Sequence, residues 1–165
     1  MSTPLWLRTV VFTLLVPGTV LGVIPFALTE GGYGPHLQLG GMHWLGFVLL
    51  APGCAIILSC FADFVRRGRG TPAPYDPPRQ LVITGLYQYV RNPQYLGVLL
   101  VCMGQAVLTG RVILLGYAMV LGIVYHLFVR FYEEPTLKRK FGEAYLRYCD
   151  EVPRWLPKLV TRRGV

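Results

Sequence analysis

The residues best placed to do chemistry are an arginine, two adjacent glutamates and several tyrosines on either side of a long apolar segment. Arg91 precedes that segment together with Tyr87 and Tyr95, and Glu133-Glu134 follow it. Arginine binds carboxylates, glutamate binds ammonium groups or hydroxyls, and aromatic rings attract a cation such as a sulfonium by about 0.5–2 kcal/mol. These side chains predict a site for a polar, zwitterionic ligand with an apolar part.

Each of these residues also has a simpler interpretation. Arg91 alone is typical of a charge that fixes membrane orientation, and Glu133-Glu134 alone are typical of a solvated helix end. Acids at a membrane face are costly unless they are paired or hydrated. The occurrence of all three residues around one apolar segment therefore favours a binding site.

Two helices must bring these residues together. Apolar segments at about Tyr95–Thr109 and Val112–Tyr132 are separated only by Gly110 and Arg111, which predicts a tight helical hairpin. The first segment is short for a membrane span of about 17–25 residues, and the second is long enough. A hairpin returns Arg91 and Glu133 to the same membrane face.

The composition places the whole chain in a membrane. Of 165 residues, 53% are hydrophobic, and the mean hydropathy is +0.48. Two further apolar segments, Leu5–Leu28 and His43–Val65, precede the hairpin; the first lacks the basic start and cleavage site of a signal peptide. The expected fold is all-α, a polytopic membrane protein of about four transmembrane helices. It forms a single domain, 1–165, whose first 66 residues hold two spans.

Orientation follows from the lysines and arginines. Five arginines lie between residues 66 and 91, nine basic residues lie from Arg130 onward, and the hairpin tip has only Arg111. The positive-inside rule then places both termini and the central loop in the cytoplasm. Loops that face anionic lipid account for the net charge of +8 better than nucleic acid does, so the lipid bilayer is the expected partner and nucleic acid is not.

Prolines and glycines divide the cytoplasmic segments. Residues 81–85 predict a short extended piece that ends in a glycine turn, and Pro93 suits the first turn of a helix. Pro135 predicts an interruption of the last span. Beyond it, apolar residues from Leu137 to Tyr148 recur at helical spacing, which predicts an amphipathic helix that lies on the membrane or packs over the central loop.

Other polar residues favour structural roles. His126 and Gln105 lie within apolar segments and predict contacts between helices, and Asp63 predicts a local ion pair with Arg66 or Arg67. The four cysteines have neither disulfide nor metal-ligand spacing, so free thiols and no metal site are expected. The chain has no glycine-rich dinucleotide fingerprint after a strand, which excludes a Rossmann-type enzyme.

The C-terminal half resembles the integral membrane methyltransferases that include isoprenylcysteine carboxyl methyltransferase and the phospholipid methyltransferases. Their shared pattern is Leu-Val-x-x-Gly-x-Tyr, Arg-His-Pro-x-Tyr-x-Gly, a hairpin, Glu-Glu, Phe-Gly-x-x-Tyr-x-x-Tyr and a final Val-Pro…Pro. The matching residues, in the same order and spacing, are Leu81-Val82, Gly85, Tyr87, Arg91, Pro93, Tyr95, Gly97, Glu133-Glu134, Phe141-Gly142, Tyr145, Tyr148, Val152-Pro153 and Pro157. The resemblance covers residues 79–157, nearly half of the chain.

The resemblance implies S-adenosylmethionine as the cofactor, bound on the cytoplasmic side. The residues that it places around the cofactor are Gln80, Leu81, Val82, Tyr87, Arg91, Asn92, Pro93, Gln94, Tyr95, Glu133 and Glu134. It also implies that a basic residue before the acids orients the methyl acceptor, and Arg130 is the match. The family histidine is Asn92 here, which can form hydrogen bonds but cannot act as a base. No catalytic residue is assigned.

The expected activity is methyl transfer to a lipophilic small molecule or lipidated acceptor at the cytoplasmic membrane face. The acceptor group, a carboxylate, thiol or amine, is left open. One alternative is a membrane reductase of the sterol reductase type that uses NADPH, although those enzymes favour Arg-His-x-Asn-Tyr-x-Gly-Asp where this chain has Pro93 and no Asp after Gly97. Another is a non-catalytic lipid-binding membrane protein, for which Asn92 is the main argument.

Overall fold

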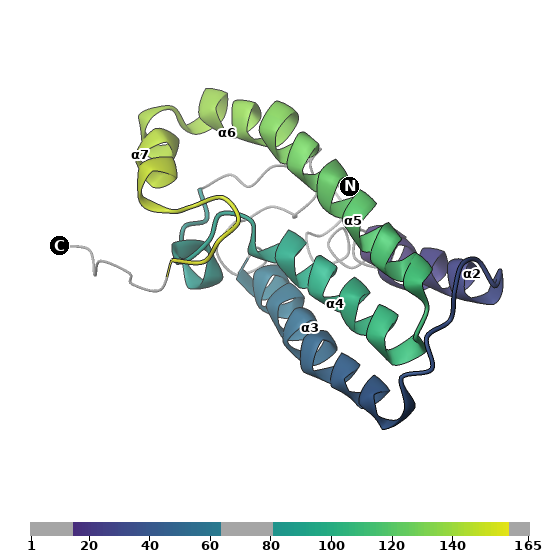
Figure 1. Cartoon of the computed structure of the whole chain (residues 1–165). Coiled ribbons are helices and arrows are strands. Elements are labelled where there is room, and N and C mark those ends of the chain that lie inside the picture. The colour runs from purple at the N-terminus through teal and green to yellow at the C-terminus, as the bar shows by residue number, and fades with distance from the viewer. Residues whose placement is uncertain (1–14, 64–80, 159–165) are drawn as a thin grey trace, which may run out of the picture.

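The described part of the protein is a bundle of helices with no strand. A computed structural model describes residues 15–63 and 81–158. Its α-helices are α2 (Ile24–Glu30), α3 (Gly46–Asp63), α4 (Pro93–Thr109), α5 (Val112–Phe128), α6 (Glu134–Phe141) and α7 (Glu143–Glu151). Helices α3, α4 and α5 run side by side, α2 packs against one side of α4 and α5, and α6 and α7 fold back over the end of the bundle (Figure 1). The expectation of an all-helical fold is confirmed.

Four glycines allow the closest contact in the bundle, between antiparallel helices α3 and α4. A Cβ atom on Gly53 would lie 2.8 Å from the carbonyl oxygen of Gly97, and one on Gly104 would lie 2.8 Å from that of Gly46. Real Cβ atoms essentially never approach other atoms this closely. Small residues at such positions let two apolar helices pack backbone to backbone. The facing glycine pairs therefore hold the start of α4 close to the end of α3.

The predicted hairpin between α4 and α5 is confirmed. Helix α4 ends at Thr109, Gly110 adopts a left-handed conformation with φ 65°, and α5 begins at Val112. Glycine reaches this conformation without the steric cost that other residues have. The loop before α3 fastens the tip, since Leu37 N donates to Gly110 O at 2.8 Å.

A π-turn and a proline shape the N-terminal helix. The helix widens at Thr19–Val23, where Ile24 N donates to Thr19 O, and Pro25 has no N–H to offer Leu21 O. The carbonyls of Val20 and Leu21 instead accept hydrogen bonds from side chains of the hairpin. Gln105 Nε2 donates to Leu21 O at 2.7 Å, and Tyr117 Oη donates to Val20 O at 2.9 Å. The predicted interhelical role of Gln105 is thus realised with a backbone partner.

The same device occurs where α5 ends. A π-turn at Val129–Glu133, closed by Glu134 N donating to Val129 O, connects α5 to α6, and Pro135 lies in the first turn of α6. The prediction that Pro135 interrupts this helix is wrong, because the chain widens into a π-turn before the proline and the helix continues to Phe141. Both glutamates consequently lie at the junction of the π-turn and α6.

The predicted amphipathic helix is divided in two. Gly142, with φ 53° and ψ −129°, separates α6 from α7. The apolar side of this pair packs over residues 81–92, the central segment: Tyr145 and Tyr148 are buried and pack against the partly buried Leu81 and Leu137. Of the central loop, the described apolar contact is with Leu81.

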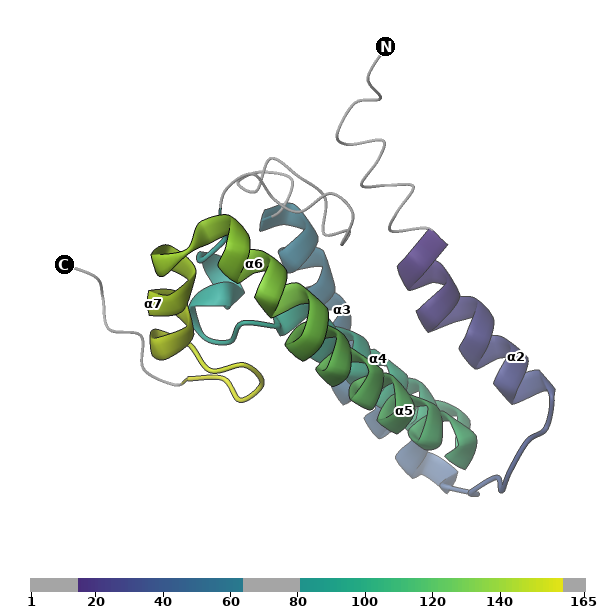
Figure 2. The same ribbon diagram turned by 90° about the horizontal axis from the view of Figure 1, so that it is seen from above.

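Two described helices, Gly40–Asp63 and Val112–Phe141, are long and apolar enough to cross a membrane. Two shorter apolar helices, Leu15–Glu30 and Pro93–Thr109, accompany them. Seen from above, the axes of all four helices lie roughly parallel to one another (Figure 2). Two of the four expected crossings thus correspond to helices long enough to span a membrane. The first residues of the first expected span lie outside the described residues.

Candidate functional site

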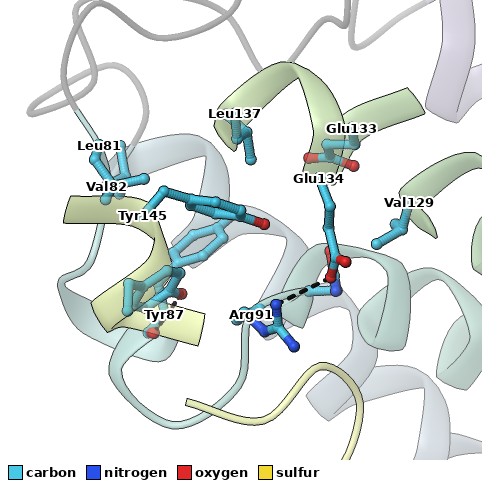
Figure 3. Close-up of a pocket in the computed structure, with 11 residues that line it drawn as sticks. Leu81, Val82, Tyr87, Arg91, Val129, Glu133, Glu134, Leu137 and Tyr145 are labelled. Atoms are coloured by element: carbon cyan, nitrogen blue, oxygen red, sulfur yellow. Dashed lines mark hydrogen bonds and ion pairs between the residues drawn. The ribbon is translucent and has the colours of Figure 1, made fainter. Parts of the chain in front are cut away.

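One pocket lies at the end of the bundle where α6 and α7 fold over the central segment (Figure 3). The residues that line it are Leu81, Val82, Tyr87, Arg91, Asn92, Val129, Glu133, Glu134, Leu137, Tyr145 and Tyr148. The cavity measures about 60 Å³, and the empty space between these walls, including its open side, is about 510 Å³. Charged groups from both sides of the hairpin thus share one largely apolar pocket.

The central segment reaches the pocket through a glycine turn. Thr84 is extended, Gly85 has φ 62°, and a short 3₁₀ turn covers Gly85–Gln88. A Cβ on Gly85 would collide with the carboxylate of Asp63 at the end of α3. The turn is therefore packed directly against α3, which fixes where Arg91 and the start of α4 lie. The predicted partners of Asp63, Arg66 and Arg67, lie outside the described residues.

Glu134 joins two arginines at the floor of the pocket. Its carboxylate accepts hydrogen bonds of 2.7 Å from Arg154 Nε and 2.7 Å from Arg154 Nη2, and one of 3.0 Å from Arg91 Nη1. The hydrogen bond to Glu134 raises the pKa of Arg154 above its usual value. Arg91 already has a carboxylate partner within the protein, and that partner is the second acid, Glu134.

One buried nitrogen of Arg91 has no hydrogen-bond partner among the described residues. Arg91 Nη1 also lies 2.8 Å from Cys149 Sγ, whereas Nε is the buried nitrogen that lacks a partner. A buried donor without a partner costs about 1–3 kcal/mol. A carboxylate or other acceptor on a bound ligand would remove that cost.

Glu133 is held from the side of the hairpin. Its Oε2 accepts a hydrogen bond of 3.0 Å from Tyr95 Oη, and the Tyr95 ring packs against Tyr125 with a centroid distance of 4.5 Å. Tyr95 itself is not among the lining residues. It therefore orients the Glu133 carboxylate toward the pocket and does not line the pocket itself.

The C-terminal strap, residues 152–158, ties the two sides of the site together. Arg91 N donates to Pro153 O at 2.9 Å, and Lys158 N donates to Tyr89 O at 2.8 Å. Asn92, which is only 7% exposed, donates from Nδ2 to Arg154 O at 3.1 Å. The residue at the family histidine position thus holds the strap that carries Arg154.

Three tyrosines form the wall opposite the acids. Tyr148 Oη donates to Tyr87 O at 2.8 Å, and Tyr145 packs against Tyr148 with a centroid distance of 6.2 Å. Burial is the main cause that raises the pKa of Tyr87, Tyr145 and Tyr148 well above the usual tyrosine value. All three hydroxyls therefore stay protonated at physiological pH, and the single hydroxyl hydrogen of Tyr148 is already committed to Tyr87 O.

The structure brings together most of the residues predicted from the sequence. Seven of them line the pocket: Leu81, Val82, Tyr87, Arg91, Asn92, Glu133 and Glu134. Four others do not line it: Pro93, Gln94, Tyr95 and Arg130. Pro93 is buried as the first residue of α4, and Gln80 lies outside the described residues.

Arg130 lies away from the pocket, on the outer side of the π-turn. Its side chain is exposed, and its guanidinium carbon lies 5.9 Å from the centroid of the Phe131 ring. Nearby, on the outer side of α5, Trp155 Nε1 donates to His126 Nδ1 at 3.1 Å. The expected packing role of His126 is therefore a contact with the strap.

Sequence reasoning missed five residues of the site. Val129, Leu137, Tyr145 and Tyr148 line the pocket, and Arg154 binds Glu134 in a bidentate manner. Val129 and Leu137 lie four residues before and after Glu133, so helical periodicity alone could have identified both. Arg154 gave no such signal, because its contact joins segments that only the fold brings together. The described residues contain no group of three potential metal ligands.

Comparison with known proteins supports a membrane methyltransferase. Residues 41–144 match the family described as phospholipid methyltransferase. Protein-S-isoprenylcysteine O-methyltransferase B of Arabidopsis thaliana is 36% identical over 81 residues, which cover 47% of this chain and 40% of that protein. Delta(14)-sterol reductase LBR of Gallus gallus is 27% identical over 161 residues, which cover 76% of this chain and 25% of that protein.

The chain spans only a quarter of the length of the reductase and two fifths of that of the methyltransferase. No solved structure matches the chain.

Proposed function

From the premise that this chain belongs to the phospholipid methyltransferase family, we propose that it transfers a methyl group from S-adenosylmethionine to a lipophilic acceptor. The observation that carries the proposal is the pocket in which Arg91, Glu133 and Glu134 meet apolar and aromatic walls. The family match gives the reaction class. The pocket provides, within this chain, groups suited to a zwitterionic nucleoside.

The donor set fits the proposed cofactor chemically. The unpartnered Arg91 Nε suits the carboxylate of the amino acid part, Glu133 suits its ammonium group or the ribose hydroxyls, and apolar side chains such as Leu137 suit the purine. The cavity of about 60 Å³ is smaller than the roughly 300–1,000 Å³ typical of ligand sites. Binding of a nucleoside of this size therefore requires the pocket to widen.

S-adenosylmethionine, when bound, supplies a methyl group that its sulfonium already activates. The protein's part is to align the acceptor and exclude water, which contribute to the rate without proton transfer. Asn92 is committed to the strap and cannot take a proton, so no general base is assigned. A carboxylate or thiolate acceptor needs no base, and this favours an anionic acceptor over an ammonium.

The acceptor is proposed to reach the site from the bilayer. We place four crossings in the membrane, with both termini and the central loop in the cytoplasm, on the basis of the distribution of basic residues. The pocket then lies at the cytoplasmic face, and the exposed Arg130 lies at the cytoplasmic end of the last span. A lipophilic acceptor with an anionic head would meet Arg130 at that interface.

A membrane reductase is the second candidate, because the match to Delta(14)-sterol reductase LBR covers 76% of this chain. A reductase of that type would bind NADPH in place of S-adenosylmethionine. The pocket argues against it, since Glu133 and Glu134 would repel the phosphates of a dinucleotide, and the two arginines that the described residues bring there, Arg91 and Arg154, are both paired with Glu134.

The test is a transfer assay with the full chain in detergent micelles. Methyl-labelled S-adenosylmethionine is supplied with lipophilic carboxylates, thiols and amines in turn, and label in the organic phase is counted. We expect incorporation of label into a lipophilic acceptor and loss of that incorporation in Glu133→Gln. Arg130→Ala should raise the KM for the acceptor. Incorporation into hydrophilic acceptors alone, or NADPH-dependent reduction without methyl transfer, contradicts the proposal.

A further inference from the structure

The helix that begins as α5 is longer than the hydrocarbon core of a membrane. It continues through the π-turn and α6, so that Val112–Phe141 forms one helix of 30 residues. At about 1.5 Å per residue this helix is roughly 45 Å long, whereas a bilayer measures about 30 Å across its core and about 40–45 Å with both headgroup layers. Since we place α5 across the membrane, the turns of α6 lie at the level of the headgroups of the cytoplasmic leaflet.

One side of this helix changes from apolar to basic along its length. Exposed apolar side chains recur on it at intervals of three or four residues, at Val120, Val124, Leu127 and Phe131. This spacing places them on one side of the helix. About two turns beyond Phe131, the exposed side chains on this side are Lys138 and Arg139. The side that faces the lipid chains therefore leads directly to two cations at the depth of the headgroups.

The protein does not neutralise these two cations. Neither Lys138 nor Arg139 forms a salt bridge with a described residue, and Arg139 Nη2 donates only to the hydroxyl of Thr136. The one acid of α6, Glu134, is committed to the two arginines of the pocket. Residues outside the described ranges hold seven arginines and a single acid, Asp76, so they add positive charge overall. Both cations are therefore available to an anion from outside the chain.

We propose that Lys138 and Arg139 bind the phosphate of an anionic phospholipid in the cytoplasmic leaflet, whose acyl chains lie against the apolar side of the helix. Phe131 precedes Lys138 by about 10 Å of helix, and one headgroup layer is about 5–8 Å deep, so a single lipid can contact both. A zwitterionic lipid balances its phosphate with its own cation, whereas an anionic lipid keeps a net negative charge for the two side chains. Soluble RNA would match the cations but not the apolar side chains that lead to them. The inference rests on the proposed placement in the membrane and is independent of methyl transfer.

The test is photolabelling of the purified full chain in phosphatidylcholine vesicles. A trace of phospholipid with a diazirine in the acyl chain close to the headgroup is added, either as anionic phosphatidylglycerol or as phosphatidylcholine, and labelled residues are mapped by mass spectrometry. Residues 115–120, at the other end of the same helix, are the internal reference. We expect the ratio of phosphatidylglycerol label to phosphatidylcholine label on residues 124–132 to exceed the ratio on the reference at least about threefold, because lysine and arginine near the surface attract anionic lipid.

Arg139→Gln tests the site, and Arg147→Gln is its matched control, because both arginines are exposed on the cytoplasmic helices and Arg147 belongs to α7. The label ratio on residues 124–132 should fall by about half or more in Arg139→Gln, fall further in Lys138→Gln with Arg139→Gln, and stay unchanged in Arg147→Gln. Salt at about 1 M should weaken the preference of the unmodified protein, since it screens exposed charges.

Equal label ratios at the two ends of the helix in the unmodified protein overturn the proposal, as do equal effects of Arg139→Gln and Arg147→Gln. Retention of polyuridylate by the chain in neutral vesicles, lost in Arg139→Gln, would assign the cations to RNA and overturns it as well.

Discussion

Replacing Glu134 by glutamine should destabilise the protein far more than the loss of an ordinary surface acid. In the folded state this carboxylate is the counter-charge of both Arg91 and Arg154, and the side chains of the three residues are only 18%, 12% and 26% exposed. The substitution leaves two guanidinium groups close together without a negative charge. The C-terminal strap then loses its charged contact with α6.

The magnitude follows from the three hydrogen bonds that Glu134 accepts. Removing one partner of a buried ion pair costs about 3–5 kcal/mol, and partial exposure of all three side chains reduces this. We expect the free energy of unfolding to fall by about 2–3 kcal/mol. The double substitution Glu134→Gln with Arg154→Met should recover part of the loss, because it removes one of the two unpaired cations.

The assay is thermal or denaturant unfolding of the purified protein in one detergent, read from tryptophan fluorescence, since Trp155 lies in the strap. Glu143→Gln is the matched control, because Glu143 is exposed on α7 and makes no salt bridge in the described structure. If Glu134→Gln and Glu143→Gln lower stability equally, the charge network does not contribute what its geometry indicates.

Three further substitutions test separate contacts. Asn92→His should retain the strap, because an imidazole N–H can replace the amide donor to Arg154 O, whereas Asn92→Asp should loosen it and increase proteolysis of the C-terminus; equal proteolysis of both refutes the assigned role. Gly53→Ala should lower stability by more than about 1 kcal/mol, since its Cβ would lie 2.8 Å from Gly97 O, while Gly116→Ala should have little effect; equal melting temperatures contradict the close packing of α3 and α4. Tyr95→Phe should weaken S-adenosylmethionine binding about three- to tenfold through a less ordered Glu133, and Tyr89→Phe, on an exposed residue, is its control; equal affinities contradict an orienting role.

Local signals predicted the hairpin and the start of α4 correctly. Pro93 begins a helix because its fixed φ and missing N–H suit the first turn, and Gly110 closes the hairpin because it reaches positive φ without cost. The short distance between two apolar segments then required antiparallel neighbours. For these reasons Arg91 and Glu133 could be assigned to one pocket from the sequence alone.

Proline misled the prediction at Pro135. The sequence shows that the N–H is missing, but it does not show whether the chain bends or widens into a π-turn in response. At both Pro25 and Pro135 the helix widens and continues. At Gly142 the error was the opposite one. The regular spacing of apolar residues predicted one continuous helix, whereas the helix ends at Gly142, which adopts a positive φ, and a second helix follows.

The partners of Arg91 were not predictable from spacing. Arg154, the other arginine that binds Glu134, lies 20 residues after it in sequence and reaches the site only because α6, α7 and the strap fold back over the central segment. From charge complementarity, the sequence predicted that Arg91 binds a ligand. In the structure, Arg91 donates a hydrogen bond to Glu134. The positions of pocket residues followed from local rules, and their partners followed from the tertiary fold.

The central claim is that the pocket between Arg91 and Glu133 binds S-adenosylmethionine. Isothermal titration calorimetry of the purified full chain with S-adenosylmethionine and, separately, NADPH tests it most directly. We predict saturable binding of S-adenosylmethionine and none of NADPH, with affinity reduced about tenfold or more in Arg91→Ala and in Glu133→Gln, since hydrogen bonds to charged groups contribute about 1.5–3 kcal/mol. Binding of NADPH alone, or full affinity for S-adenosylmethionine in both variants, would contradict the claim.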